Sequence, residues 1–362
     1  MIHCTRCDYQ PDIKTSPYCC PICGGYFDYK DVFDFDLDKV DRRQPGIWRY
    51  RASFGLPEEI DPVSLGEGDT PLIWDEVGEK KVGFKLDYIN PTLSYKDRGT
   101  SVLASVLKWA GVKEAIEDSS GNAGASFAAY SSCAGIHGRV YVPDYASGPK
   151  RSQIEAYGSE LVPVAGPRSN ASDAVKRDAA RGHTYASHVY QPYVMAGYAT
   201  AAYEIFEQSG GEPGSILLPA GQGTFLLGIA RGFQALHQQG LISRVPEMVG
   251  VQSQACAPLY AAYQESENEG TKVNEGETVA EGIRILHPLR KEQVLAAVTS
   301  SQGWMTAVEE NEILPGRDAL AKRGFHVEPT SAVVWPALTT HIDRLLEPIV
   351  VVLTGSGLKY GS

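Results

Sequence analysis

The stretch NPTLSYKDRG (90–99) places a lysine where its amine could act as a nucleophile. Pro91 favours an extended or turn conformation, and Ser94 is a candidate cap for a helix that begins near Tyr95. Lys96 would then lie in the first turn of that helix, where the helix dipole disfavours the charged form of an amine. The neutral amine is the form that makes a Schiff base. A solvated lysine at a helix start gives the same pattern, so the stretch alone leaves both interpretations open.

Three other stretches combine glycines with hydroxyl groups, and each lies at or after the end of a predicted strand. They are EDSSGNAGAS (117–126), LLPAGQGTFLLG (217–228) and VVVLTGSGLKY (350–360). Glycines let the backbone approach a ligand closely, and the free N–H groups at a helix start attract an anion such as phosphate. Helix caps and ordinary turns produce similar stretches, so each one is weak evidence when taken alone.

Cysteines near the N-terminus have the spacing of a zinc site. Two Cys-x2-Cys pairs are present, formed by Cys4 with Cys7 and by Cys20 with Cys23. Two such pairs supply four thiolates in a tetrahedral arrangement, which suits zinc, and we expect a structural Zn²⁺ there. Cys19 is a spare whose spacing to Cys23 is worse. A redox pair or a set of reduced thiols is the alternative, and the acidic stretch that follows disfavours a nucleic-acid-binding role.

The elements that must position these groups follow an alternating pattern from about residue 95 onward. Short apolar runs typical of strands alternate with segments of helical spacing. The runs are RVYVPD (139–144), ELVPVAG (160–166), SILLPA (215–220), EMVGVQS (247–253) and PIVVVLTG (348–355). This alternation predicts an α/β fold with parallel sheets covered on both faces, whose ligands bind beyond the carboxyl ends of the strands. The polar stretch 263–278 is expected to be a loop.

The composition limits the classes of partner. The 362 residues carry a net charge of −11, which disfavours binding to the phosphate backbone of nucleic acids. No apolar run is long enough to span a bilayer, and the N-terminus lacks a hydrophobic signal core. We therefore expect no nucleic-acid partner, no membrane partner and a cytoplasmic location. A local basic pocket for a small anionic ligand remains compatible with this charge.

Taken in order, the motifs resemble those of the threonine synthases and, more widely, of the fold type II (tryptophan-synthase-β-like) pyridoxal-phosphate enzymes. The resemblance covers nearly the whole chain after residue 65, and some family members also have an N-terminal Cys-x2-Cys segment. The motifs are GEGDTPL (66–72), NPTLSYKDRG (90–99), SSGNAGAS (119–126), AGQGTFLLG (220–228), ETVAEGIRI (277–285), EPTSAVVWPAL (328–338) and LTGSGLK (353–359).

The resemblance implies two doubly wound domains after a small zinc-ribbon-like segment. The ribbon segment would be residues 1–30. The large cofactor-binding domain would comprise 31–115 and 195–362, and a smaller mobile substrate-binding domain would comprise 116–194. The resemblance also implies a homodimer whose partner molecule is a small amino-acid substrate.

The resemblance further implies roles for individual residues. Lys96 would form the Schiff base with pyridoxal 5'-phosphate and then move protons at the substrate carbons. Cofactor contacts would come from Asn122 at the 3-hydroxyl, from Gly221, Gln222, Gly223 and Thr224 at the phosphate, and from Thr354 at the pyridine nitrogen. Substrate contacts would come from Ser119 and Ser120 at the carboxylate. Tyr95, Glu281 and Gly282 would lie near the cofactor.

Departures from the family pattern lie beside the expected substrate. Leu93 stands where the family has glycine, and Val194 stands where threonine synthases have an arginine that helps hold the substrate phosphate. His188 lies in the same segment and is a candidate substrate contact. The resemblance implies a threonine synthase-like lyase that converts O-phosphohomoserine to threonine by γ-elimination and β-addition of water. The alternative is β-elimination or β-replacement on serine, threonine, phosphoserine or a related amino acid.

Overall fold

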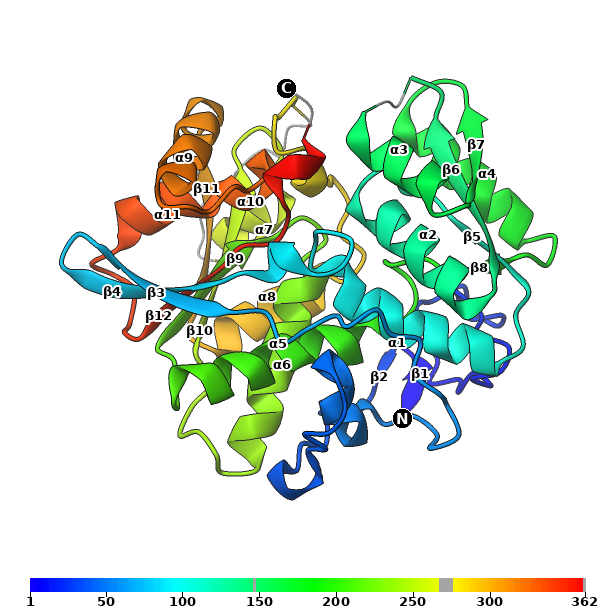
Figure 1. Cartoon of the computed structure of the whole chain (residues 1–362), viewed down its shortest axis with the longest axis horizontal. Coiled ribbons are helices and arrows are strands. Elements are labelled where there is room, and N and C mark those ends of the chain that lie inside the picture. The colour runs from blue at the N-terminus through cyan, green and yellow to red at the C-terminus, as the bar shows by residue number, and fades with distance from the viewer. Residues whose placement is uncertain (146–147, 267–275, 361–362) are drawn as a thin grey trace. The chain divides into compact units, whose positions relative to one another are not determined.

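The computed structural model describes residues 1–145, 148–266 and 276–360 (Figure 1). Its contacts divide the chain into two compact units. Unit 1 comprises Met1–Gly68 and Asn90–Gly197, and unit 2 comprises Asp69–Ile89 and Tyr198–Tyr360. Within these described ranges, no helix has both the length and the apolar character needed to cross a membrane.

Unit 1 begins with a small cysteine-containing hairpin. Strands β1 (Ile2–Cys4) and β2 (Phe27–Tyr29) pair in antiparallel fashion, and the buried Cys4, Cys20 and Phe27 form a small core between them. The loop between the strands packs against residues 185–193 of the same unit. Gln191 Nε2 donates to the carbonyl of Ser16 at 3.0 Å, and the ring of Tyr18 lies 5.4 Å from that of Tyr190. The hairpin is therefore docked on unit 1 and is not a free appendage.

A parallel sheet forms the centre of unit 1. Its strands lie in the order β7-β6-β5-β8, and every pair is parallel. The strands are β5 (Glu114–Glu117), β6 (His137–Pro143), β7 (Glu160–Val164) and β8 (Thr184–Tyr185). The helices are α1 (Lys96–Trp109), α2 (Asn122–Ala134), α3 (Pro149–Ala156) and α4 (Arg168–Ala179). Helices α2 and α4 pack on the sheet, and α1 packs on α2.

A buried carboxylate ties the lead-in segment of unit 1 to its helices. Glu67, in the GEGDTPL motif, accepts hydrogen bonds from Trp48 Nε1 at 2.9 Å and from Ser101 Oγ at 2.5 Å through Oε1. Its Oε2 accepts from the Tyr130 hydroxyl at 2.7 Å. Because a buried carboxylate without such donors would be costly, this position favours glutamate strongly. The motif thus fixes α1 and α2 against residues 46–54.

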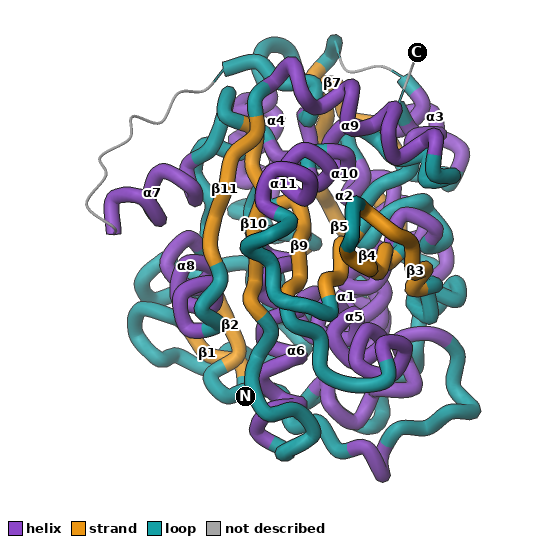
Figure 2. Tube along the Cα trace, turned by 90° about the vertical axis from the view of Figure 1, so that its left-hand side faces the viewer, coloured by secondary structure: helices purple, strands orange, loops and turns teal. Residues whose placement is uncertain are grey.

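Unit 2 is built on a second, larger sheet. Its strand order is β11-β10-β9-β12-β4-β3, parallel except for the β3–β4 pair at one edge. The strands are β3 (Leu72–Val77), β4 (Lys80–Lys85), β9 (Ser215–Pro219), β10 (Glu247–Ser253), β11 (Trp304–Val308) and β12 (Ile349–Val352). Figure 2 shows β11, β10 and β9 side by side. Every residue of β9 and β12 is buried, as expected for central strands covered on both faces.

Helices surround this second sheet. Helix α5 (Val194–Ser209) leads into unit 2 from unit 1, and α6 (Thr224–Gln238) follows β9. The others are α7 (Pro258–Ser266), α8 (Lys291–Ser300), α9 (Glu310–Lys322), α10 (Pro329–Ala332) and α11 (Val334–His341). The expected loop at 263–278 overlaps the end of α7, and its residues 267–275 lie outside the described residues.

The predicted α/β class with parallel sheets is confirmed, and each of the five apolar runs contains a strand. The β3–β4 hairpin was missed because its polar, charged residues carry no apolar run, as is common at the edge of a sheet. The contacts place 116–194 together with 90–115 in unit 1. The proposed movement of 116–194 as a separate domain stays a prediction.

Candidate active site

Lys96 lies where the sequence predicted, at the start of a helix of unit 1. It is the first residue of α1 and is partly buried, and its Nζ lies 4.6 Å from the centre of the Tyr95 ring. The predicted cap is wrong, because Tyr95 holds the N-cap position without a side-chain hydrogen bond. Ser94 is instead buried, and within the described part of the chain its Oγ has no hydrogen-bond partner.

The residue after the lysine fixes the start of α1. Asp97 is fully buried, and its carboxylate accepts hydrogen bonds from the backbone N–H and the hydroxyl of Thr92, both at 2.6 Å. It also accepts one from Ser126 Oγ on α2 at 2.6 Å. Because Ser126 lies one turn after Asn122, the two helix starts are held together. Asp97 therefore positions Lys96 relative to the α2 loop.

Leu93 occupies a strained backbone position. Its φ is +66°, in the left-handed region that costs a side-chain-bearing residue about 1–2 kcal/mol. This conformation explains why glycine is typical of the position in the family that the sequence resembles. The surrounding fold holds the leucine there, since its N–H donates to the carbonyl of Asn90 at 2.7 Å. Strain of this kind often accompanies functional loops.

The serine-rich loop leads tightly into α2. Helix α2 starts at Asn122, and its N-cap Gly121 makes no side-chain capping bond. Ser119 is buried, and its Oγ accepts from the N–H of Gly121 at 3.2 Å. A Cβ on Gly124 would lie 1.8 Å from the carbonyl oxygen of Ser119, so only glycine fits there. The loop, which also contains Ser120, thus folds back on an uncapped helix start that suits a carboxylate.

His188 pairs with a glutamate that the sequence reasoning did not single out. Its Nδ1 lies 2.6 Å from Oε1 of Glu117, the last residue of β5, and the Glu117 side chain is fully buried. Burial and the nearby Asp118 raise the pKa of Glu117 well above its usual range. Burial and the charge of Lys96 lower the pKa of His188 well below its usual range. The position of Glu117, directly before the DSSGN stretch at a strand end, was the signal available for it.

Unit 2 provides the glycine loop predicted for a phosphate. The loop Gly221–Thr224 joins β9 to α6, and Gly223 is the N-cap of α6, with φ +70° and no side-chain capping bond. A Cβ on Gly221 would lie 2.9 Å from the Cα of Ile283, and one on Gly223 would lie 2.6 Å from Cγ2 of Val294. Gln222 Oε1 accepts from the N–H of Leu289 at 3.0 Å. Close packing therefore requires both glycines.

Thr354 follows the strand next to β9. It is buried, and its backbone N–H donates to Ser331 Oγ at 2.9 Å. The neighbouring Thr330 Oγ1 accepts from the N–H of Gly282 at 3.1 Å, and the Gly282 carbonyl oxygen would lie 3.1 Å from a Cβ on Gly221. These contacts gather the Thr354, Gly282 and Gly221 segments at the carboxyl ends of β9 and β12, where ligands of parallel sheets bind.

These features fit pyridoxal phosphate. The start of α6 combines free helix N–H groups with a glycine loop that has no room for side chains, as a phosphate requires. Unit 1 carries Lys96, Asn122, Ser119, Ser120 and His188, and unit 2 carries Gly221, Gln222, Gly223, Thr224 and Thr354. The residues that the sequence reasoning missed are Glu117 and Asp97.

The four predicted zinc ligands form a separate cluster in the N-terminal hairpin. The Sγ atoms of Cys4, Cys7, Cys20 and Cys23 all lie within 4.8 Å of one another. Cys4 Sγ and Cys23 Sγ are 3.4 Å apart, and Cys7 Sγ and Cys20 Sγ are 3.6 Å apart. Cys19 lies outside this group. The thiols are free rather than paired in disulfides, and their convergence fits a tetrahedral metal ion.

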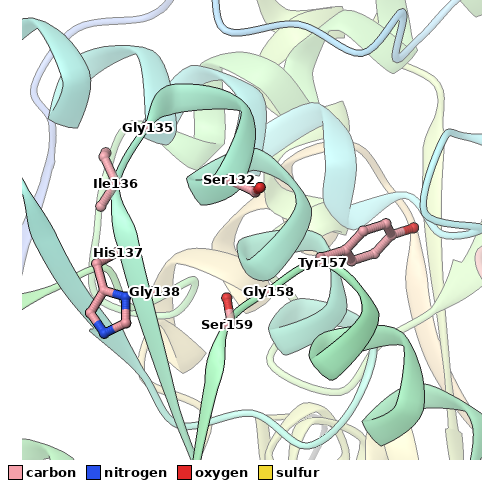
Figure 3. A pocket seen from close by; sticks show the side chains of 8 residues that line it. All are labelled: Ser132, Gly135, Ile136, His137, Gly138, Tyr157, Gly158 and Ser159. Atoms are coloured by element: carbon pink, nitrogen blue, oxygen red, sulfur yellow. The ribbon is translucent and has the colours of Figure 1, made fainter.

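A surface pocket of unit 1 lies away from these residues. Figure 3 shows it at the end of α2, with Tyr157 and His137 projecting beside it. Its volume is about 240 Å³, and it is lined by Ser132, Gly135, Ile136, His137, Gly138, Tyr157, Gly158 and Ser159. Gly135 is the C-cap of α2, whereas the predicted site residue Asn122 is the first residue of the helix. The pocket is therefore not part of the candidate site.

Comparisons with known proteins agree with this site. The family described as "Pyridoxal-phosphate dependent enzyme" matches residues 63–355. A threonine synthase from Methanocaldococcus jannaschii is 33% identical over 98% of this chain and 92% of its own length. A threonine synthase from Synechocystis is 32% identical over 86% of this chain and 82% of its own length.

Solved structures show the same fold. A bacterial-type threonine deaminase, from the organism abbreviated T.th., has a TM-score of 0.67 and 25% identity over 81% of this chain and 94% of its own. Maize serine racemase has a TM-score of 0.69 and 20% identity over 81% of this chain and 89% of its own, a likeness of fold. The chain therefore belongs to the family of pyridoxal-phosphate dependent enzymes and, within it, to the threonine synthase group.

Proposed function

We propose that this protein is a pyridoxal-phosphate-dependent carbon–oxygen lyase of the threonine synthase type. It would convert O-phosphohomoserine to threonine by γ-elimination of phosphate and β-addition of water. The observation that carries the proposal is the 33% identity to a threonine synthase over 98% of this chain and 92% of the relative. A match of this extent includes the lysine, serine and glycine loops together.

The residues of the chain would divide the work between binding and proton transfer. The bound cofactor supplies an electron sink for negative charge at the substrate carbons. Lys96 would take and return protons at those carbons, from the position that Asp97 fixes. Ser119 and Ser120 would hold the substrate carboxylate beside Asn122, at the uncapped start of α2. The hydroxyl of Thr354 would face the ring nitrogen and leave it unprotonated, which favours elimination over transamination.

The test is an assay of purified protein with O-phosphohomoserine, in which phosphate and threonine are measured together. We expect both products in equal amounts. The protein should also show the visible absorbance of a lysine-bound cofactor, and Lys96→Ala should abolish both the absorbance and the products. A protein that binds no pyridoxal phosphate under any reconstitution condition would overturn the proposal.

A second candidate is β-elimination or β-replacement on serine, threonine, phosphoserine or a related amino acid. Val194, at the position expected for a phosphate-binding arginine, is the first residue of α5 and is buried. An apolar side chain there offers nothing to a phosphate dianion. The likeness to a threonine deaminase at 25% identity is compatible with this candidate. Activity on serine, threonine or phosphoserine without phosphate release from O-phosphohomoserine would favour it.

We also propose that the four clustered cysteines hold a structural Zn²⁺. The convergence of the Sγ atoms within 4.8 Å supports this, since four soft thiolate ligands suit zinc. Metal analysis of protein purified without chelators should give one zinc per chain. The homodimer and the cytoplasmic location stay predictions, which light scattering of the purified protein and imaging of the tagged protein in cells would test.

A further inference from the structure

Glu117 and His188 lie at the same edge of the unit 1 sheet. Strands β5 and β8 are parallel neighbours, with Ile116 opposite Tyr185. Glu117 ends β5, and His188 follows three residues after β8. Both therefore lie at the carboxyl ends of the strands, where ligands of such sheets bind and where the DSSGN loop begins.

The pair shares a proton in a setting that separates it from ordinary ion pairs. The Oε1–Nδ1 distance is 2.6 Å, and the side chains of Glu117 and His188 are 0% and 14% exposed. The other oxygen of Glu117, Oε2, is buried, and it has no hydrogen-bond partner among the residues that the structure describes. A buried carboxylate with a bare oxygen is costly, whereas a protonated carboxyl group that donates from Oε1 avoids most of that cost.

The surrounding charges act in the same direction. Asp118 lies beside Glu117, and its Oδ1 accepts from the Tyr185 hydroxyl at 2.6 Å. Burial first, and then Asp118, raise the pKa of Glu117, while Lys96 on α1 lowers it less. Burial, Lys96 and Arg168 of α4 lower the pKa of His188, against the effect of Asp118. The proton therefore belongs on Glu117, and the imidazole is neutral.

We propose that Glu117 and His188 form a proton relay, in which Glu117 donates to Nδ1 and the neutral imidazole presents its Nε2–H to the oxygen that leaves the substrate. Glu117 is the positioning residue and the proton reserve, and His188 is the group that meets the substrate. The assignment of the leaving oxygen rests on the proposed function. The tautomer of His188 does not depend on it.

The relay balances protons over one turnover. When the carbon–oxygen bond to the leaving group breaks, its electron pair goes to the oxygen, which takes the proton from Nε2. Nδ1 takes the proton of Glu117 at the same time, so the imidazole stays neutral and Glu117 becomes a carboxylate. The water molecule that adds to the substrate then loses one proton, which returns through Nε2 and Nδ1 to Glu117. The sum is phosphate ester plus water giving alcohol plus hydrogen phosphate.

The same strand supplies a matched control. Glu114 begins β5, and its Oε1 lies 2.9 Å from Nδ1 of His183, with both side chains 38% exposed. This second pair has the same atoms in contact and the same parent strand, but it lies at the opposite end of the strand. Glu114→Gln therefore removes a similar pair without touching the relay.

The first experiment reads the tautomer by long-range proton–nitrogen NMR of ¹⁵N-histidine-labelled holoenzyme, with His188→Gln to assign the signal. We expect a neutral His188 with its proton on Nε2 across neutral pH. The Glu117→Gln variant should keep this tautomer, because its amide also donates to Nδ1. A proton on Nδ1, or a His188 that titrates near pH 6.5, would overturn the proposal.

The second experiment separates kcat from KM. Glutamine cannot release a proton, so Glu117→Gln should lower kcat by about 100-fold or more, the usual contribution of general acid–base catalysis, and leave KM little changed. Glu114→Gln should match the wild type, and thermal melting checks that both variants are folded. An unchanged kcat in Glu117→Gln would refute the relay. If the wild type acts on serine and not on O-phosphohomoserine, the proposed function fails, and the same comparison with serine tests the relay.

Discussion

Gly223 offers the sharpest test of how the phosphate loop is built, because two separate costs of a side chain can be measured there. Its φ of +70° alone should cost an alanine about 1–2 kcal/mol. The added Cβ would also lie 2.6 Å from Cγ2 of Val294, and overpacking of this kind costs about 1–3 kcal/mol. We therefore expect Gly223→Ala to destabilise unit 2 by about 2–5 kcal/mol.

Gly240 provides the control for the backbone cost. It follows the same helix, has a φ of +71°, and would place a Cβ with no heavy atom within 4 Å. Gly240→Ala should therefore cost only about 1–2 kcal/mol. Val294→Ala opens the space that the new Cβ needs, so the double variant Gly223→Ala/Val294→Ala should recover about 1–3 kcal/mol relative to the sum of the single variants.

The assay is thermal unfolding followed by circular dichroism, with the cofactor removed. One kcal/mol corresponds to roughly 2–4 °C for a unit of 150–250 residues. Absorbance titration with pyridoxal phosphate should show weaker binding for Gly223→Ala and unchanged binding for Gly240→Ala. If Gly223→Ala melts no lower than Gly240→Ala, or if Val294→Ala gives no recovery, then the close approach at Gly223 does not determine the loop.

Three further changes probe other parts of the chain. Lys85→Met should lower the free energy of unfolding by about 3–5 kcal/mol, because it leaves the carboxylate of Glu204, 2.7 Å from the lysine Nζ, buried without its cation; a melting point indistinguishable from that of the wild type would refute this. A backbone N–H and a neighbouring arginine hold the pKa of Asp75 below 3.8, so its contribution to stability is present above that pH and is lost as the pH falls through the lower folded value. Asp75→Asn should therefore flatten the fall in melting temperature below pH 3.8, and an unchanged profile would contradict the ion pair. Cys20→Ser should reduce the zinc content and the melting temperature, whereas Cys19→Ser should change neither, and equal zinc loss in both would argue against the assigned ligand set.

Local sequence carried much of the site. The apolar runs before Gly221 and Thr354 predicted buried strands, and glycine-rich stretches at strand ends predicted ligand loops, because both properties depend on neighbours along the chain. The structure adds that Gly221 and Gly223 are required by contacts with Ile283 and Val294. Such contacts join residues far apart in sequence, so one sequence alone does not reveal them.

The failures have the same origin. Ser94 has the residue type of a helix cap, but tertiary packing buries it and the helix starts at Lys96. Glu117 has the residue type of a surface charge, and only the pairing of β5 with β8 brings it to His188. Burial of a carboxylate is a property of the fold, and a single sequence gives no direct sign of it.

The docking of the N-terminal hairpin has a consequence for biosynthesis. The hairpin leaves the ribosome first, but its anchor Gln191 lies 175 residues after Ser16. At the usual rate of about 5–20 residues per second, the docking surface is complete roughly 9–35 s later. Throughout that interval the four thiols of the hairpin are exposed to oxidation and to other metals. Capture of zinc by the nascent hairpin would protect them, and it would give the later residues 185–193 a finished surface on which to fold.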